Sequence, residues 1–330
     1  MHGEPSIKSD LTNLQRGLMT EADARAMLER IRWPNGLACV FCGVMEVGRI
    51  ETKASTRTNG RPIPARHLFK CKACKKQFSV TKGTIFEDSK IPLQLWITVM
   101  YRMCSSKRGI SAHQIHREYG VWYEAAWFML QRIRWAMSDK NPTLLSGVVE
   151  ADETYVGGKP RGHRRGIQQT ISRSELIKEA WAKKTPVVGI LERGGRVRAT
   201  VITHPVNRKM AQSYLRANVD FTKSALITDE SWLYGGIDKE LPHGVVRHKS
   251  EYVRGTTHTQ GIESFWSILK RGLIGTYYHV DAAYLNQYVQ EFAFRHNARK
   301  ITDAERFASL LGQVEGRLDW YVGRDVQEPS

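Results

Sequence analysis

Residues 148–158 have the sequence Val-Val-Glu-Ala-Asp-Glu-Thr-Tyr-Val-Gly-Gly, and this stretch decides the interpretation of the C-terminal half of the chain. Its β-branched residues predict a strand, which the two glycines end. Side chains two positions apart on a strand share a face, so Glu150 and Asp152 are expected to point the same way. A single acid is ordinarily a solvated surface charge. Acids within an apolar strand instead favour a functional site.

The segments that follow predict a mixed α/β core. Gly194-Gly195 is typical of a hairpin turn between two further strands, 186–192 and 197–203. Patterns of apolar residues then predict a helix at 208–217, a short buried strand at 225–228 and closing helices at 261–271 and 282–296. This order of elements is compatible with a ribonuclease-H-like core.

Two more acids are candidates for the same site. Asp229 ends the strand at 225–228, and Glu263 begins a helix. Three converging carboxylates need a cation to remain charged together, and hard oxygen ligands favour Mg²⁺ or Mn²⁺. Two such ions about 4 Å apart activate a nucleophilic oxygen and stabilise the leaving oxygen in phosphoryl transfer. Lys270 lies two helical turns after Glu263, where its charge can hold a phosphate.

Four cysteines in the N-terminal part form two pairs with CxxC spacing: Cys39, Cys42, Cys71 and Cys74. Four thiolates at this spacing can close a tetrahedron around one structural Zn²⁺. The alternatives are unrelated thiols or a redox pair. The polar segment between the pairs is expected to be an exposed hairpin, and its function is open. Cys104 lies on an apolar helix face and is expected to be a buried thiol.

The region between the cysteines and the acids is predicted to be helical. A capping box at Thr20 predicts a helix before the cysteines, with Ala26, Met27 and Ile31 buried. Three helices are expected between 92 and 137, with breaks at Gly109 and Gly120, an arrangement typical of a helix-turn-helix. The aromatic side chains of the third helix are interpreted as core, although they can also stack on bases: Trp122, Trp127, Phe128 and Trp135.

The fold class that follows is multidomain α/β. We predict an N-terminal helix and zinc ribbon in 1–90, a helix-turn-helix-like DNA-binding region in 91–142 and a ribonuclease-H-like catalytic core in 143–330.

The charge of the 330-residue chain points to a polyanionic partner. Its 50 Lys and Arg exceed its 33 Asp and Glu and give a net charge of +17. Such a balance suits nucleic acid, and also ribosomal proteins or anionic membrane surfaces. We expect no membrane-spanning segment and no signal peptide, and therefore a cytoplasmic, nucleoid-associated protein.

Candidate DNA contacts follow from the position of cations near the acids. A basic loop follows Asp152, and further cations flank Glu263; the candidates are Lys159, Arg161, Arg164, Arg165, Lys249, Arg254, Lys270 and Arg271. The same loop can instead be a solvated surface. His258 is expected either to contact the site or to cap the helix that follows it.

Several blocks resemble a known family. Residues 150–159 (Glu-Ala-Asp-Glu-Thr-Tyr-Val-Gly-Gly-Lys), 187–198, 228–230 and 251–272 resemble, in order, the catalytic blocks of ISXO-type DDE transposases of bacterial insertion sequences. Residues 71–89 are similar to the exit of that family's zinc ribbon. The resemblance implies a ribonuclease-H-like fold and the triad Asp152, Asp229 and Glu263. Gln260 departs from the Asn found in many relatives, and some relatives carry Asn in place of the third acid.

The function implied is a transposase. It would bind the terminal inverted repeats of its element, cut the strand at each end with divalent metal, and join the freed 3′-hydroxyl to target DNA. Because two ends must be processed together, a homodimer or larger assembly on double-stranded DNA is expected. The alternatives are a ribonuclease-H-like nuclease that joins no strands, and a non-catalytic zinc-ribbon DNA-binding regulator.

Overall fold

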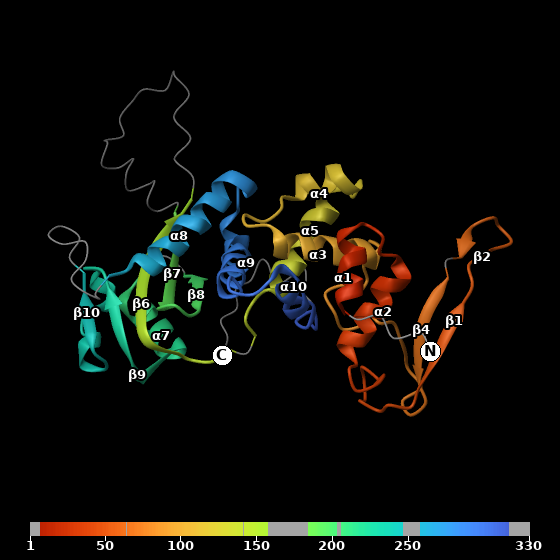
Figure 1. The fold of residues 1–330 in the computed structure, drawn as a ribbon, viewed down its shortest axis with the longest axis horizontal. Helices are drawn as coiled ribbons and strands as arrows, with labels where there is room; N and C mark the ends of the chain where they lie inside the picture. Colours follow the sequence, from red (N-terminus) through yellow and green to blue (C-terminus); the bar gives the residue numbers. More distant parts are fainter. Residues whose placement is uncertain are drawn as a thin grey trace, which may run out of the picture. The chain divides into compact units, whose positions relative to one another are not determined.

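The computed structural model describes residues 7–63, 65–140, 142–157, 184–202, 206–246 and 258–316 (Figure 1). They group into two compact units. Unit 1 is made of Met1–Ser106, Ala112–Ala136 and Ile301–Val322, and unit 2 of Lys107–Ser111, Met137–Lys300 and Gly323–Ser330. Among the described residues, no helix combines the length and the apolar character needed to cross a membrane.

Helix α2 (Glu21–Arg32) of unit 1 begins with the predicted capping box. The Thr20 hydroxyl accepts the backbone N–H of Asp23, and the Asp23 carboxylate accepts the N–H of Thr20. Met27 is buried as expected, but the prediction that Ala26 is buried is wrong. The helix is rotated so that its buried positions are Ala24, Met27 and Leu28.

The other helices of unit 1 are α1 (Ile7–Gln15), α3 (Leu93–Ser105), α4 (Ala112–Tyr119), α5 (Tyr123–Ala136) and α10 (Asp303–Leu311). Cys104 is fully buried on α3, which confirms the prediction for this thiol. Trp122 is 79% exposed, so the interpretation of this residue as core is wrong. It immediately precedes α5 and therefore lies outside the face of that helix that packs inward.

Helix α10 returns to unit 1 from the end of the described chain and packs on α3. The Arg306 guanidinium donates to the backbone oxygen of Cys104 at 2.7 Å, across 202 positions of sequence. The rings of Tyr101 and Phe307 meet edge to face, with centroids 5.6 Å apart. Unit 1 is therefore built from both ends of the described chain.

The cysteine-bearing part of unit 1 is a three-stranded antiparallel sheet of order β1-β4-β5. It consists of β1 (Val47–Thr52), β4 (Arg66–Cys71) and β5 (Gln77–Phe78). Buried Phe69 and Phe78 pack under Trp33, with ring centroids 5.5 and 6.2 Å from the indole. Beyond this core, β2 (Ser55–Thr56) and β3 (Pro62–Ile63) continue the hairpin as a two-stranded ribbon.

Unit 2 contains a five-stranded mixed sheet of order β10-β9-β6-β7-β8. Its strands are β6 (Leu145–Val156), β7 (Thr185–Glu192), β8 (Val197–Val201), β9 (Val219–Thr228) and β10 (His243–Val245). The first three form an antiparallel meander, and β9 then pairs with β6 in parallel. Gly194, with φ of +71°, makes the predicted turn between β7 and β8.

Helices cover both faces of this sheet (Figure 1). On one face, α8 (Gln260–Gly272) and α9 (Leu285–Asn297) form an apolar core with β7 and β8. On the other, α7 (Arg208–Asn218) packs on β6 and β9. Side chains of β6 alternate between these faces, since Val149 and Ala151 lie in the second core while Glu150 and Asp152 bond to α8. The mixed α/β core predicted from the sequence is therefore present.

Candidate active site and metal centres

The four paired cysteines of unit 1 converge. Their sulfur atoms all lie within 4.8 Å of one another. The Sγ atoms of Cys39 and Cys74 are 3.7 Å apart, and those of Cys42 and Cys71 are 3.6 Å apart. Tetrahedral Zn²⁺ with Zn–S bonds of about 2.3 Å requires sulfurs about 3.8 Å apart. The cluster therefore fits one structural zinc ion with no open coordination position.

Backbone groups around the second knuckle favour the thiolate form that a metal needs. The N–H groups of Cys74 and Ala73 hydrogen-bond to Cys71 and lower the pKa of its thiol to about 7. On the first knuckle the Phe41 N–H points at the Cys39 sulfur, 3.4 Å away. Amides aimed at sulfur are the arrangement expected of a closed zinc knuckle, and they disfavour four unrelated thiols.

In unit 2 the sheet brings two acids together at the point where the parallel pairing of β6 with β9 ends. β6 and β9 run parallel, with Ala151 opposite Thr228, so Asp152 and Asp229 follow at the same level. Their carboxylates, with that of Glu153, lie within 4.8 Å of one another and form an acidic cluster. Three oxygen donors at this spacing fit a hard divalent cation such as Mg²⁺ or Mn²⁺.

The electrostatics of the acidic cluster match that interpretation. Burial, followed by the charges of Asp229 and Glu153, raises the pKa of Asp152 to about 7. Burial is also the main cause that raises the pKa of Glu153. Without a cation these carboxylates repel one another, and a bound divalent ion relieves that repulsion.

Glu153 is a member of the acidic cluster that the sequence did not single out. Neighbours on a strand point to opposite faces, so it was not expected beside Asp152. Hydrogen bonds fix it: Ser231 donates to its Oε1 at 2.8 Å and Tyr234 to its Oε2 at 3.3 Å. Asp229 also accepts the Ser231 N–H, at 3.0 Å. The turn after β9 therefore holds both acids.

Helix α8 contributes an indole to the site. Trp266 Nε1 donates to Asp152 Oδ2 at 3.0 Å, which fixes the orientation of that carboxylate. The ring lies over Gly189, which is the residue opposite Asp152 on β7. A Cβ atom at position 189 would come within 2.5 Å of the ring, so glycine is required for this approach.

A second buried acid, Glu150, connects β6 to the first turn of α8. Its side chain is fully buried, and its Oε2 accepts the backbone N–H of Ile262 at 3.0 Å. Arg193 bonds to Glu150 Oε1 at 3.0 Å and also donates to the backbone oxygen of His258. The His258 ring is 3.8 Å from Glu150, so this histidine contacts the strand acid at the start of the helix.

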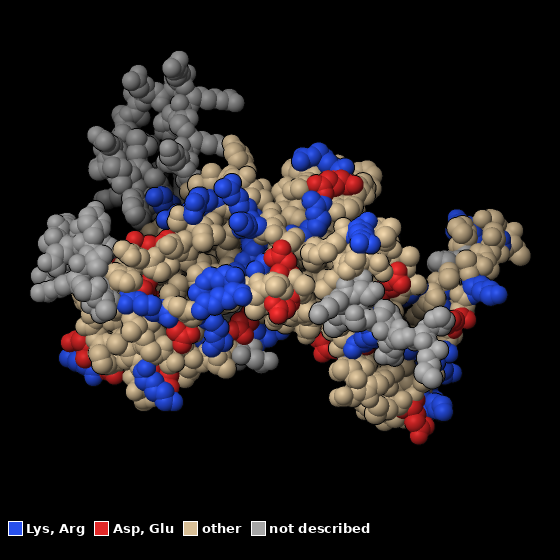
Figure 2. Space-filling model, viewed as in Figure 1, with Lys and Arg blue, Asp and Glu red and all other residues tan. Residues whose placement is uncertain are grey.

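Glu263 lies apart from the acidic cluster formed by the described residues, which consists of Asp152, Glu153 and Asp229. Its side chain is exposed and accepts a hydrogen bond from the Thr259 hydroxyl at 2.7 Å. Its role as third acid stays a prediction. Lys270 and Arg271 are exposed in the last turn of α8, over which Figure 2 shows a basic patch.

The other predicted DNA contacts fall outside the described residues: Lys159, Arg161, Arg164, Arg165, Lys249 and Arg254.

Comparisons with known proteins agree with this combination of sites. Residues 144–297 match the ISXO2-like transposase domain, and residues 19–77 match the transposase zinc-ribbon domain. The chain is also similar to the "Uncharacterized protein in transposable element ISH50" of Halobacterium salinarum. The two are 27% identical over 299 residues, which cover 89% of this chain and 96% of that protein.

Proposed function

We propose that the chain is a transposase with an N-terminal zinc ribbon, since its segments match the ISXO2-like transposase domain and the transposase zinc-ribbon domain, and that it cuts and joins the DNA ends of its own mobile element. The observation that carries the proposal is the meeting of Asp152 and Asp229 just beyond the last paired residues of the parallel strands β6 and β9. A three-strand meander followed by a parallel strand supports a ribonuclease-H-like core, and α4 and α5 support a helix-turn-helix.

The reaction proposed is an in-line phosphoryl displacement. Water attacks the phosphorus at each element end and the 3′-oxygen leaves, which frees a 3′-hydroxyl. That hydroxyl then attacks the phosphorus of a target phosphodiester, and the 3′-oxygen of the target strand leaves with the proton. Asp152 and Asp229 would hold Mg²⁺ or Mn²⁺, which supplies Lewis-acid stabilisation of the transferred phosphoryl group. Trp266 orients Asp152, and Ser231 orients Asp229, through the hydrogen bonds described above. Glu263 completes the proposed triad.

Binding to double-stranded DNA is assigned to unit 1 and to the cations near the acidic cluster. Lys270 and Arg271 are proposed phosphate contacts, as are the predicted cations outside the described residues. Two element ends must be cut in one complex, so the active form is proposed to be a dimer or larger assembly. Sedimentation of a paired-end complex with one copy of the chain would contradict this.

The test is a cleavage assay with purified protein, Mg²⁺ and a plasmid that carries the DNA flanking the gene. Asp152→Asn and Asp229→Asn proteins are the matched controls, because each removes a charge and retains the shape of the side chain. Cleavage at the flanking ends that leaves 3′-hydroxyls, and that both variants lack, is the expected result. Specific binding without cleavage in Mg²⁺ or Mn²⁺ would instead indicate a regulator, and cleavage without joining a nuclease.

A further inference from the structure

The segment between the cysteine pairs extends well beyond the zinc ribbon. Residues 52–66, here called the arm, have the sequence Thr-Lys-Ala-Ser-Thr-Arg-Thr-Asn-Gly-Arg-Pro-Ile-Pro-Ala-Arg. Apart from Ile63 and Pro64, whose side chains are not described, every residue of the arm is exposed. A segment that buries so little adds little to the stability of its own domain. Its contacts are therefore to be sought outside the chain.

The arm nevertheless has an ordered backbone. Ser55 pairs with Ile63 and Thr56 with Pro62 in an antiparallel ribbon. Its turn is closed by the Arg57 N–H donating to the Arg61 oxygen at 2.8 Å, and Gly60 provides the positive φ of +76° that the turn requires. At about 3.3 Å per residue the turn reaches roughly 20 Å beyond Thr52.

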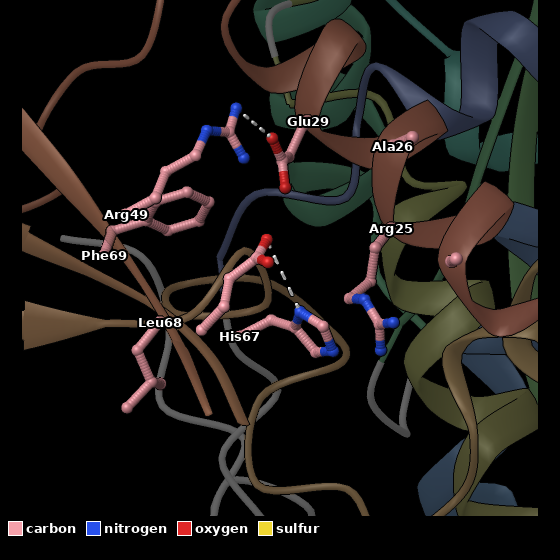
Figure 3. Close-up of a pocket in the computed structure, with 9 residues that line it drawn as sticks. Arg25, Ala26, Glu29, Arg49, His67, Leu68 and Phe69 are labelled. Atoms are coloured by element: carbon pink, nitrogen blue, oxygen red, sulfur yellow. Dashed lines mark ion pairs between the residues drawn. The ribbon is translucent and has the colours of Figure 1, made fainter. Parts of the chain in front are cut away.

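The base of the arm is held against α2, with a cavity of about 340 Å³ between them (Figure 3). Arg49 of β1 forms an ion pair with Glu29 of α2 at 2.8 Å, and its guanidinium also lies over the Phe69 ring. Across the ladder, Glu51 faces His67 at 3.9 Å. The charged side chains at the base are therefore paired with each other. Their contacts with α2 also fix the direction in which the arm projects.

The charge of the arm differs from that of its base. It contains four cations and no Asp or Glu: Lys53, Arg57, Arg61 and Arg66. Among the described residues, no ion pair is recorded for any of the four. Figure 2 shows basic side chains at intervals along the arm. Four unneutralised cations on a narrow ribbon favour a polyanionic partner.

The shape of the arm favours DNA over other polyanions, and its charge disfavours contact with the arm of a second copy. The major groove of DNA, about 12 Å wide, admits a two-stranded β-ribbon. Two identical arms would repel each other, and Pro62 and the charged side chains discourage pairing of the ribbon edge with another strand. From these observations we infer that the arm lies in the major groove of the element-end DNA, with its cations on the phosphates that line the groove.

This inference rests on the proposed function and is tested on binding rather than on cleavage. The arm variant is Lys53→Gln, Arg57→Gln and Arg61→Gln in the full-length chain. The matched control removes three exposed lysines from unit 2: Lys209→Gln, Lys223→Gln and Lys239→Gln. Both variants have a net charge of +14, so a general effect of charge is the same in each. Zinc content and melting temperature verify that both fold.

The measurement is fluorescence anisotropy with a labelled duplex from the flanking DNA, at salt concentrations from 0.05 to about 0.3 M. The arm variant is expected to lose affinity by at least about tenfold at 0.15 M salt, and its salt slope is expected to fall by about one for each cation removed. The control is expected to retain the wild-type slope. Equal losses in both variants, or a wild-type slope in the arm variant, would overturn the inference.

The outcomes separate this inference from the proposed function. If the wild-type chain cleaves flanking DNA and the arm variant binds it normally, the arm is not a DNA contact although the transposase assignment stands. If the wild-type chain neither binds nor cleaves duplex DNA, both fail. If the arm variant binds DNA normally but no longer self-associates in sedimentation, the arm is a protein contact and the inference is wrong.

Discussion

Glu150 accepts the backbone N–H of Ile262 and so caps α8 from a strand 112 positions earlier in the chain. The residue at the N-cap position, Thr259, makes no capping hydrogen bond with its side chain. Gly261 lies so close that a Cβ atom there would be 2.7 Å from the Glu150 oxygen. The start of the helix that carries Trp266 and Glu263 is therefore fixed to the strand that carries Asp152.

Removing this cap should loosen α8 specifically. Glu150→Ala leaves Arg193 and the Ile262 N–H without their buried partner, and we expect a loss of about 2–4 kcal/mol of stability. Glu150→Gln retains an acceptor oxygen and should lose less. Hydrogen exchange is expected to rise in the first turn of α8 in the alanine variant, with kcat for cleavage falling more than DNA affinity. The matched control is Glu291→Ala.

Glu291 is also fully buried and paired with an arginine, Arg295, but it lies on α9. Glu291→Ala should lower stability yet leave exchange at the start of α8 unchanged. If it accelerates that exchange as much as Glu150→Ala does, the cap has no particular role.

The third acid of the site can be identified by comparing two variants. Glu263→Gln is expected to abolish cleavage, because the resemblance to ISXO-type transposases assigns it to the triad. Glu153→Gln is expected to lower the rate by about tenfold, or about 1.4 kcal/mol, since Ser231 and Tyr234 can still hold an amide at that position. The cleavage rate at saturating DNA is the measurement. A larger loss of rate in Glu153→Gln than in Glu263→Gln would identify Glu153 as the third carboxylate.

Zinc removal should unfold the ribbon without unfolding unit 2. Cys71→Ser is expected to lower the zinc content from one ion per chain to none, because three thiolates no longer close the tetrahedron. Metal analysis and limited proteolysis between β1 and β5 measure the two effects. Cys104→Ser is the matched control, since that thiol is buried on α3 and is not a member of the cysteine cluster. Loss of zinc from the control would contradict the assignment.

Acid should destabilise unit 2 through His296. Burial, followed by the charge of Arg299, lowers the pKa of this ring from 6.5 to about 4. Between those values the unfolded chain binds a proton that the folded chain does not, so stability falls as the pH decreases from 6.5 to 4. His296→Phe should remove at most about 1 kcal/mol of that dependence, because the ring is only partly buried. The urea midpoints of the wild-type chain and of the variant at pH 7 and 5 measure this dependence. The same difference between the two pH values in both proteins would contradict the prediction.

Strong patterns located most of the elements. The helix predicted from residue 123 to 137 is α5, which buries apolar residues at helical spacing. The strand predicted at 186–192 is β7, an almost continuous apolar run that is buried on both faces. The strand predicted at 225–228 is only the buried end of β9, whose earlier residues include polar, exposed Thr222 and Lys223. β10 was missed because it has three residues, too few for a period.

The site was predicted only in part, for physical reasons. The apolar strands around Asp152 and Asp229 identified these two acids. Glu153 was missed because its position depends on the turn after β9, where Ser231 and Tyr234 bind it. No local pattern indicates that Gly189 leaves room for Trp266, since that contact joins β7 to a helix far along the chain.

The packing of α10 on α3 also determines when unit 1 can finish folding during synthesis. During synthesis the ribosome releases the zinc ribbon and α3 early, but the segment that carries Arg306 and Phe307 emerges only after all of β6 to α9. Unit 1 therefore cannot finish folding until unit 2 has been translated. A message truncated before codon 301 would yield a chain whose cysteines are complete but whose α3 lacks its cover.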